Sequence, residues 1–190
     1  MPFVEDLQHP PTVVITLTEA KRQLRVDDPK APYFEDESFK QYIKSAIRYA
    51  ENFTKLEIVQ KKFRITGSSF EDVLSVDKQV LISVDAFTYK NPSGDTVEVP
   101  TDQYFLQSED SLQTSIQFKE SYELPELLED PKAVTLELTV GFPQDQVPED
   151  IRIALLMKIA SFDSHREDSA KTMTTAIENY LSRYKTYSRW

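Results

Sequence analysis

The side chains best suited to catalysis or metal binding lie close together in one polar stretch, residues 163–168. Asp163, His165 and Glu167 supply carboxylate oxygens and an imidazole, which are groups that ligate divalent metals. On a helix Asp163 and Glu167 share a face, whereas His165 points well away from both, and Arg166 competes with a metal as a counter-ion. The spacing therefore favours a solvated helix end over a metal or acid/base site.

The motifs of common enzyme classes are absent from the sequence. It contains no cysteine, which excludes a thiolate nucleophile, a thiolate metal site and a disulfide. Its three glycines, Gly67, Gly94 and Gly141, are too far apart to build a Walker loop or a Rossmann fingerprint. We expect no enzyme, no catalytic residue, no metal and no cofactor, although two carboxylates that meet only in the folded chain stay possible.

The C-terminal segment has the composition of a binding surface. Tyr187, Arg189 and Trp190, with Arg183 upstream, combine the residue types that are enriched at the centres of protein interfaces. From Asn179 onward there is no acidic residue, although the whole chain has a formal net charge of −10. We expect these four aromatic and arginine residues to dock a partner protein; stacking on nucleic acid is a weaker alternative.

Charge and hydropathy narrow the classes of partner. A net charge of −10 repels a phosphate backbone, which disfavours tight nucleic-acid binding. The longest apolar run, Ile151–Phe162, is interrupted by charges and is shorter than the ~20 residues of a membrane span, so we expect no membrane contact. The segment Met1–Asp6 lacks the features of a secretory signal, so we expect the chain to remain in the compartment where it is made.

Helices at both ends of the chain position these residues. Thr16 and Glu19 have the spacing of a capping box, and apolar residues between Phe39 and Phe53 recur every three or four positions. A nearly continuous apolar helix follows Pro148, and we expect it to be central. Tyr180 and Tyr184 are expected to pack on neighbouring helices through the same face as the apolar residues of the last helix. The predicted helices span about 17–26, 37–54, 148–166 and 173–186.

The middle of the chain has the shorter period of strands. Val134, Leu136, Leu138 and Val140 alternate with polar residues, as in a sheet with one buried face. Asn91–Asp95, with a proline and a glycine, is typical of a hairpin loop. Further short segments are rich in β-branched and aromatic residues, and the predicted strands span about 58–66, 79–84, 86–90, 96–106, 115–118 and 133–140. We therefore predict an α+β fold, with residues 1–56 and 141–190 as a helical bundle and residues 57–140 as an inserted antiparallel β domain.

The order of these elements resembles the head-tail connector family of tailed phages, also called adaptor or head-completion proteins, including those of prophages and gene transfer agents. Ile15–Val26 is similar to the family's opening helix, and the helix that ends Ala50–Thr54 follows at the usual distance. The hairpin within Ser83–Leu106 looks like the β insertion of longer members. Val140–Pro143, followed by Val147–Leu156, resembles the family's passage of glycine, valine-proline-acid and alanine-rich helix. Lys55 departs from the pattern, because many relatives have glycine there.

The resemblance implies a structural virion protein and not an enzyme. Such a subunit self-associates into a ring, dodecameric in the particle, that sits under the portal protein, extends the DNA channel and links the capsid to the next connector, stopper or tail protein. DNA passes through the channel without sequence-specific binding. The expected location is the head-tail interface of the virion, with the host cytoplasm during assembly. In this setting Tyr187, Arg189, Trp190 and Arg183 would dock the portal.

Two alternatives remain at this point. A tail-side completion protein of similar architecture would purify with isolated tails instead of DNA-filled heads. A metal-dependent hydrolase using Asp163 and Glu167 would gain thermal stability from Mg²⁺, Mn²⁺ or Zn²⁺.

Overall fold

The described residues form two compact units, one helical and one mainly β. The structure is a computed structural model. Helices combined with an antiparallel sheet confirm the predicted α+β class. The residues that the structure describes are 2–7, 13–26, 36–74, 80–110, 112–164 and 174–186.

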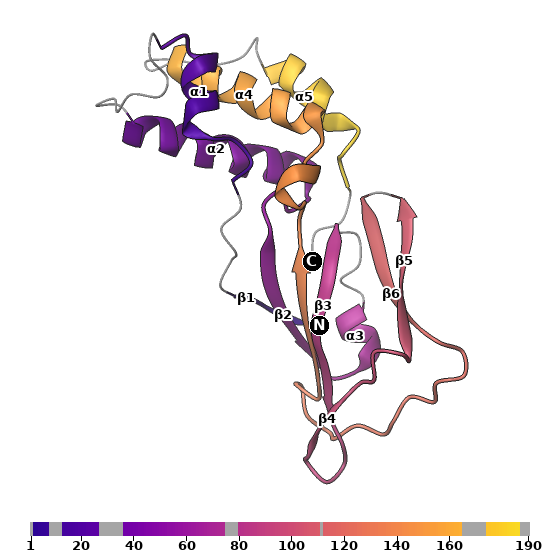
Figure 1. The fold of residues 1–190 in the computed structure, drawn as a ribbon. Coiled ribbons are helices and arrows are strands. Elements are labelled where there is room, and N and C mark those ends of the chain that lie inside the picture. Colours follow the sequence, from indigo (N-terminus) through magenta and orange to yellow (C-terminus); the bar gives the residue numbers. More distant parts are fainter. Residues whose placement is uncertain are drawn as a thin grey trace. The chain divides into compact units, whose positions relative to one another are not determined.

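The helical unit is organised around two long helices, α2 and α4 (Figure 1). Helix α4 packs against α1, α2 and α5, which confirms that the apolar helix is central. The buried side chains Ile151, Leu155 and Ile159 of α4 face this interior, and α2 contributes Phe39 and Ala46. The elements of this unit are α1 (Leu17–Gln23), α2 (Asp36–Thr54), the short 3₁₀ helix η1 (Gln144–Gln146), α4 (Glu149–Ser164) and α5 (Thr174–Ser182).

Two helices end where a residue adopts the left-handed conformation. Helix α1 stops at Gln23, earlier than expected, because Arg25 has a φ of 56° and turns the chain well before Pro29. Helix α2 ends at Thr54 as predicted, and Lys55 follows with a φ of 64°. The buried carboxylate of Glu51 then accepts a hydrogen bond from the Ile58 N–H at 3.1 Å, which fixes the turn after α2.

The β unit is built on a five-stranded antiparallel sheet with the order β1-β2-β7-β3-β4 and a separate hairpin, β5-β6 (Figure 1). Strand β7 lies between β2 and β3, and its side chains alternate as predicted, with Leu136 and Leu138 buried. The strands are β1 (Phe3–Asp6), β2 (Lys61–Gly67), β3 (Leu81–Lys90), β4 (Thr96–Glu98), β5 (Tyr104–Asp110), β6 (Gln113–Phe118) and β7 (Val134–Val140).

Three features of the β unit differ from the sequence prediction. The two strands expected in 79–90 form one strand, β3, with β-bulges that absorb its irregular pattern. The strand expected over 96–106 is two strands, because Pro100 begins a turn between them. Helix α3 (Phe70–Leu74) and strand β1 were not predicted. Helix α3, with five residues, and strand β1, with four, are too short to show a clear period.

The hairpin β5-β6 is held by aromatic packing. A two-stranded hairpin is marginal by itself, so it needs a surface to pack on. The Phe118 ring lies 5.4 Å from the Phe70 ring of α3 and 5.6 Å from the Phe87 ring of β3. Tyr104 adds an edge contact to Phe87 at 5.7 Å. These rings join the hairpin and α3 to the sheet in one core.

Candidate interaction surfaces

The start of α1 is fixed by the predicted capping box. The Thr16 hydroxyl accepts a hydrogen bond from the Glu19 N–H at 3.2 Å, and the Glu19 carboxylate accepts from the Thr16 N–H at 2.7 Å. The Thr16 hydroxyl also donates to the same carboxylate at 2.7 Å. This arrangement leaves the second oxygen of Glu19 free to face α4.

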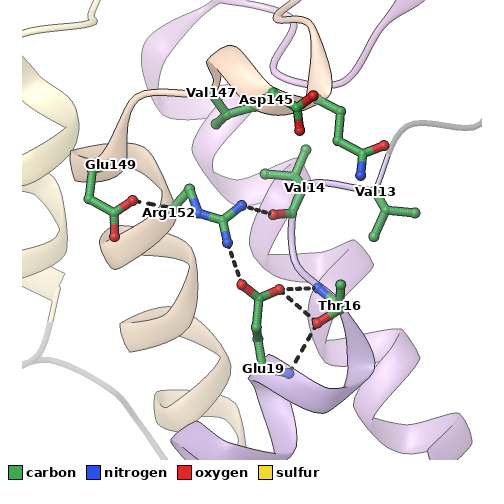
Figure 2. A pocket seen from close by; sticks show the side chains of 9 residues that line it. Val13, Val14, Thr16, Glu19, Asp145, Val147, Glu149 and Arg152 are labelled. Atoms are coloured by element: carbon green, nitrogen blue, oxygen red, sulfur yellow. Dashed lines mark hydrogen bonds and ion pairs between the residues drawn. The ribbon is translucent and has the colours of Figure 1, made fainter.

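Arg152 connects the start of α4 to the start of α1 within the helical unit. Its guanidinium donates to the Glu19 carboxylate and to the backbone carbonyl of Val14, and its Nε lies 3.7 Å from the Glu149 carboxylate (Figure 2). A planar guanidinium donates to several acceptors in a fixed geometry, whereas the donors of an ammonium group rotate freely. Arg152 therefore ties α1, the segment before it and α4 together.

A pocket of about 410 Å³ opens beside this arginine. Figure 2 shows Asp145 among the lining side chains, together with Glu19 and Arg152, which are in direct contact with each other. Because Glu19 and Arg152 neutralise one another, the rim acids leave the pocket with a negative balance. Its lining residues are Val13, Val14, Thr16, Glu19, Gln144, Asp145, Val147, Glu149 and Arg152.

The environment of Glu19 keeps it ionised. Burial by itself raises the pKa of a carboxyl, but the hydrogen bonds from the Thr16 side chain and backbone, together with the charge of Arg152, outweigh that effect. The pKa of Glu19 consequently lies below its ordinary value. A carboxylate held ionised by these partners has a structural task and is poorly placed to act as a proton shuttle.

Only Arg183 among the four predicted docking residues falls within the described part of the chain. It follows α5, and its guanidinium contacts the Asp150 carboxylate of α4 at 2.8 Å while the side chain remains 70% exposed. Tyr187, Arg189 and Trp190 lie outside the described residues. The structure therefore places one predicted residue at the surface beside the start of α4.

The chain after α5 is attached to the end of α2. The Thr186 N–H donates to the Thr54 carbonyl at 2.8 Å, its hydroxyl does so at 3.2 Å, and Thr186 is buried. Tyr184 is half-buried, with its hydroxyl 3.5 Å from Asp150. Tyr180 is 38% exposed, so the expectation that it packs on neighbouring helices was wrong. Ile177 and Leu181 fill that role instead.

The polar stretch that contained candidate metal ligands is described only at its beginning. Asp163 lies in the last turn of α4, whereas His165, Arg166 and Glu167 lie outside the described residues. Within the described ranges, no group of three or more metal-ligating side chains comes together. No helix in those ranges is both long and apolar enough to cross a membrane.

Sequence reasoning identified Glu19 but missed its partner. The signal was a single arginine between Ile151 and Ile153 in the most apolar helix of the chain. A charge in such a position needs a counter-ion. The identity of that counter-ion could not be read from the sequence, because Glu19 and Arg152 lie 133 positions apart.

Comparison with known proteins gives matches at the level of the fold. No protein-family model and no curated protein sequence matches the chain. A chain from the neck of an empty gene transfer agent particle, computed with C6 symmetry, superposes with a TM-score of 0.73 at 17% identity, covering 99% of this chain and 97% of that one. A chain from the virion of a native gene transfer agent particle gives 0.72 at 20% identity, with 98% and 97% covered. A chain from the neck of a native particle, computed with C12 symmetry, gives 0.70 at 16% identity, with 99% and 97% covered. The chain shares the fold of these particle components over nearly its whole length.

Proposed function

We propose that the chain is a structural virion protein, a head-tail connector subunit that forms a ring under the portal of a tailed-phage or gene-transfer-agent particle. The ring extends the DNA channel and links the capsid to the tail. The observation that carries the proposal is the fold likeness to chains from particle necks, which covers 97% of those chains and almost all of this one.

The symmetry in the descriptions of those neck structures, C6 and C12, supports self-association into a closed ring. We take a dodecamer as the form in the particle. The partners of this ring are the portal protein on one side and the next connector, stopper or tail protein on the other. The ring is located at the head-tail interface of the virion, and its subunits are in the host cytoplasm during assembly. A net charge of −10 suits a channel through which DNA moves without being held.

The contacts at the pocket favour a non-catalytic role. The most enclosed charged groups there, Glu19 and Arg152, are engaged with each other and with the backbone. A general base or nucleophile instead needs a free lone pair directed at a substrate. The pocket is therefore suited to recognising a side chain of another protein.

The C-terminal residues Tyr187, Arg189 and Trp190, together with Arg183, are proposed to dock the portal. Because Thr186 is hydrogen-bonded to Thr54, a deletion that tests portal docking without weakening the fold has to begin after Thr186. Deleting residues 187–190 keeps the Thr186–Thr54 contacts, whereas a cut after Ser182 would remove them and weaken the fold. The shorter deletion should abolish portal binding and leave the thermal melting curve unchanged. Full portal binding by this deletion would exclude the docking role of the tail.

Arg183 allows a matched comparison because its guanidinium forms an ion pair with a known residue, Asp150. Replacing Arg183 with alanine removes the cation and the contact to Asp150, whereas replacing Asp150 with asparagine breaks the same ion pair but keeps the cation. If Arg183 docks the portal, R183A weakens portal binding and D150N does not. Equal weakening by both variants would show that the ion pair acts only within the subunit.

A tail-side completion protein is the neighbouring possibility, and fractionation of particles separates the two. A connector copurifies with DNA-filled heads that lack tails. A tail-completion protein copurifies with isolated tails. Recovery of the chain only with tails would overturn the connector proposal and leave a virion role in place.

A further inference from the structure

The outer face of α2 is basic in an otherwise acidic chain. Lys40, Lys44 and Arg48 recur every four residues, which places them in a row about 6 Å apart at 1.5 Å per residue. All three side chains are exposed. Lys40 contacts Glu37 at 2.6 Å, whereas no described residue forms an ion pair with Lys44 or Arg48. Within the described part of the chain, the charges of Lys44 and Arg48 are therefore not compensated by an ion pair, whereas that of Lys40 is.

The pocket beside Arg152 has the opposite charge. Asp145, in η1, is exposed and forms no ion pair with any described residue. Glu149, in the first turn of α4, is 77% exposed and lies 3.7 Å from Arg152, too far for a short hydrogen bond. At about 410 Å³ the pocket has room for the end of a long basic side chain. Its two outer carboxylates are placed to receive one.

These two surfaces do not overlap on one subunit. The pocket is lined by α1, η1, α4 and the residues before α1, and no residue of α2 contributes to it. At 3.6 residues per turn, Lys44 and Arg48 lie on the side of α2 away from its buried residues Phe39 and Ala46, and α2 packs on the other helices of the unit. Two complementary, separate surfaces are what a head-to-tail contact between identical subunits requires, and such a contact closes into a ring when the rotation permits.

We propose that the basic face of α2, Lys44 and Arg48 above all, docks on the acidic pocket at Asp145 and Glu149 of the next copy of this chain. The inference rests on the proposed connector function, and it assigns the surface through which the ring is formed. Opposite charges across such a contact fix its register and speed assembly, and salt weakens it.

The cysteine-free sequence permits a direct test by cross-linking in the full-length chain. A chain that carries both Lys44→Cys and Asp145→Cys is oxidised alone and when bound to the portal ring. Head-to-tail contact predicts a ladder of covalent trimers and larger species, whereas either single variant can give no more than a dimer. A control chain with Lys44→Cys and Glu71→Cys, which moves the second cysteine to α3, should give no ladder. Absence of the ladder in both settings, or an equal ladder from the control, would overturn the proposal.

Charge reversal provides the second arm of the test. Exchanging Lys44 and Arg48 for glutamate should shift the chain toward monomer in sedimentation velocity, and so should exchanging Asp145 and Glu149 for lysine. Combining both exchanges should restore association. If the glutamate exchanges instead abolish binding of a labelled DNA duplex and leave association unchanged, α2 contacts DNA phosphates and the subunit contact is excluded.

Portal binding, measured on the same variants, separates this inference from the proposed function. Portal binding without any ladder removes the assigned subunit contact but leaves the connector role. A ladder without portal binding supports the contact and counts against the connector role.

Discussion

Arg152 holds three separate parts of the helical unit with one guanidinium group. It contacts the Val14 carbonyl, the Glu19 carboxylate and, at 3.7 Å, the carboxylate of Glu149. Hydrogen bonds to charged groups contribute more than neutral ones, and removing one partner leaves the other without compensation. The link between α1 and α4 should therefore depend on this residue more than on the exposed ion pairs of the chain.

Replacing Arg152 with methionine should lower the free energy of unfolding by about 1.5–3 kcal/mol. The methionine keeps much of the apolar stem but removes the donor that Arg152 supplies to one oxygen of Glu19 and to the Val14 carbonyl. Urea denaturation followed by circular dichroism measures the change. The matched control is Arg183→Met, which breaks a largely exposed ion pair and should cost no more than about 1 kcal/mol. Equal losses for the two variants would contradict the structural role of Arg152.

Glu19 should make the stability depend on pH in the acid range. Its pKa is lowered in the folded state, so the stabilisation is fully present above its unfolded pKa, about 4.3, and is lost as the pH falls through the lower folded value. The difference in unfolding free energy between wild type and Glu19→Gln should therefore be constant at neutral pH and shrink on acidification. Denaturation at a series of pH values tests this. A difference that grows on acidification would have the wrong sign.

At the scale of elements, the sequence predicted most helices and the central strand but not their exact limits. The periodicity of α2 and the alternation of β7 depend on many side chains facing one core, so both patterns are strong. Helix α1 ends at Gln23 because of a single residue beyond it, Arg25, whose left-handed conformation is not favoured by its type. The pairing of β1 with β2 joins segments about 60 positions apart, and no local pattern records it.

Lys55 adopts a conformation that glycine adopts more easily. Its φ of 64° follows the end of α2, at the position where glycine commonly ends a helix. Replacing Lys55 with glycine should therefore raise the free energy of unfolding by about 0.5–1 kcal/mol. Lys55→Ala serves as the control, because it removes the same side-chain contacts but keeps the strained backbone. Thermal unfolding in which K55G is no more stable than K55A would contradict the conformational explanation.

For the whole molecule, the fold indicates the function more strongly than any single residue does. The sequence matches no family model, and its resemblance to connectors rested on short motifs in a particular order. The structure aligns with particle-neck chains along nearly its entire length at 16–17% identity. Packing and topology tolerate many substitutions that preserve volume and pattern, so a fold outlasts recognisable sequence. The docking surface was less predictable, because the acidic pocket is assembled from segments far apart in the chain.

The connector function requires that the chain bind a portal ring. Native mass spectrometry of the full-length chain mixed with the portal ring from the same genome tests this directly. We expect a complex in which the number of bound chains matches the number of portal subunits. Deletion of residues 187–190 should prevent this binding. An intact portal ring that binds none of the full-length chain would contradict the connector function.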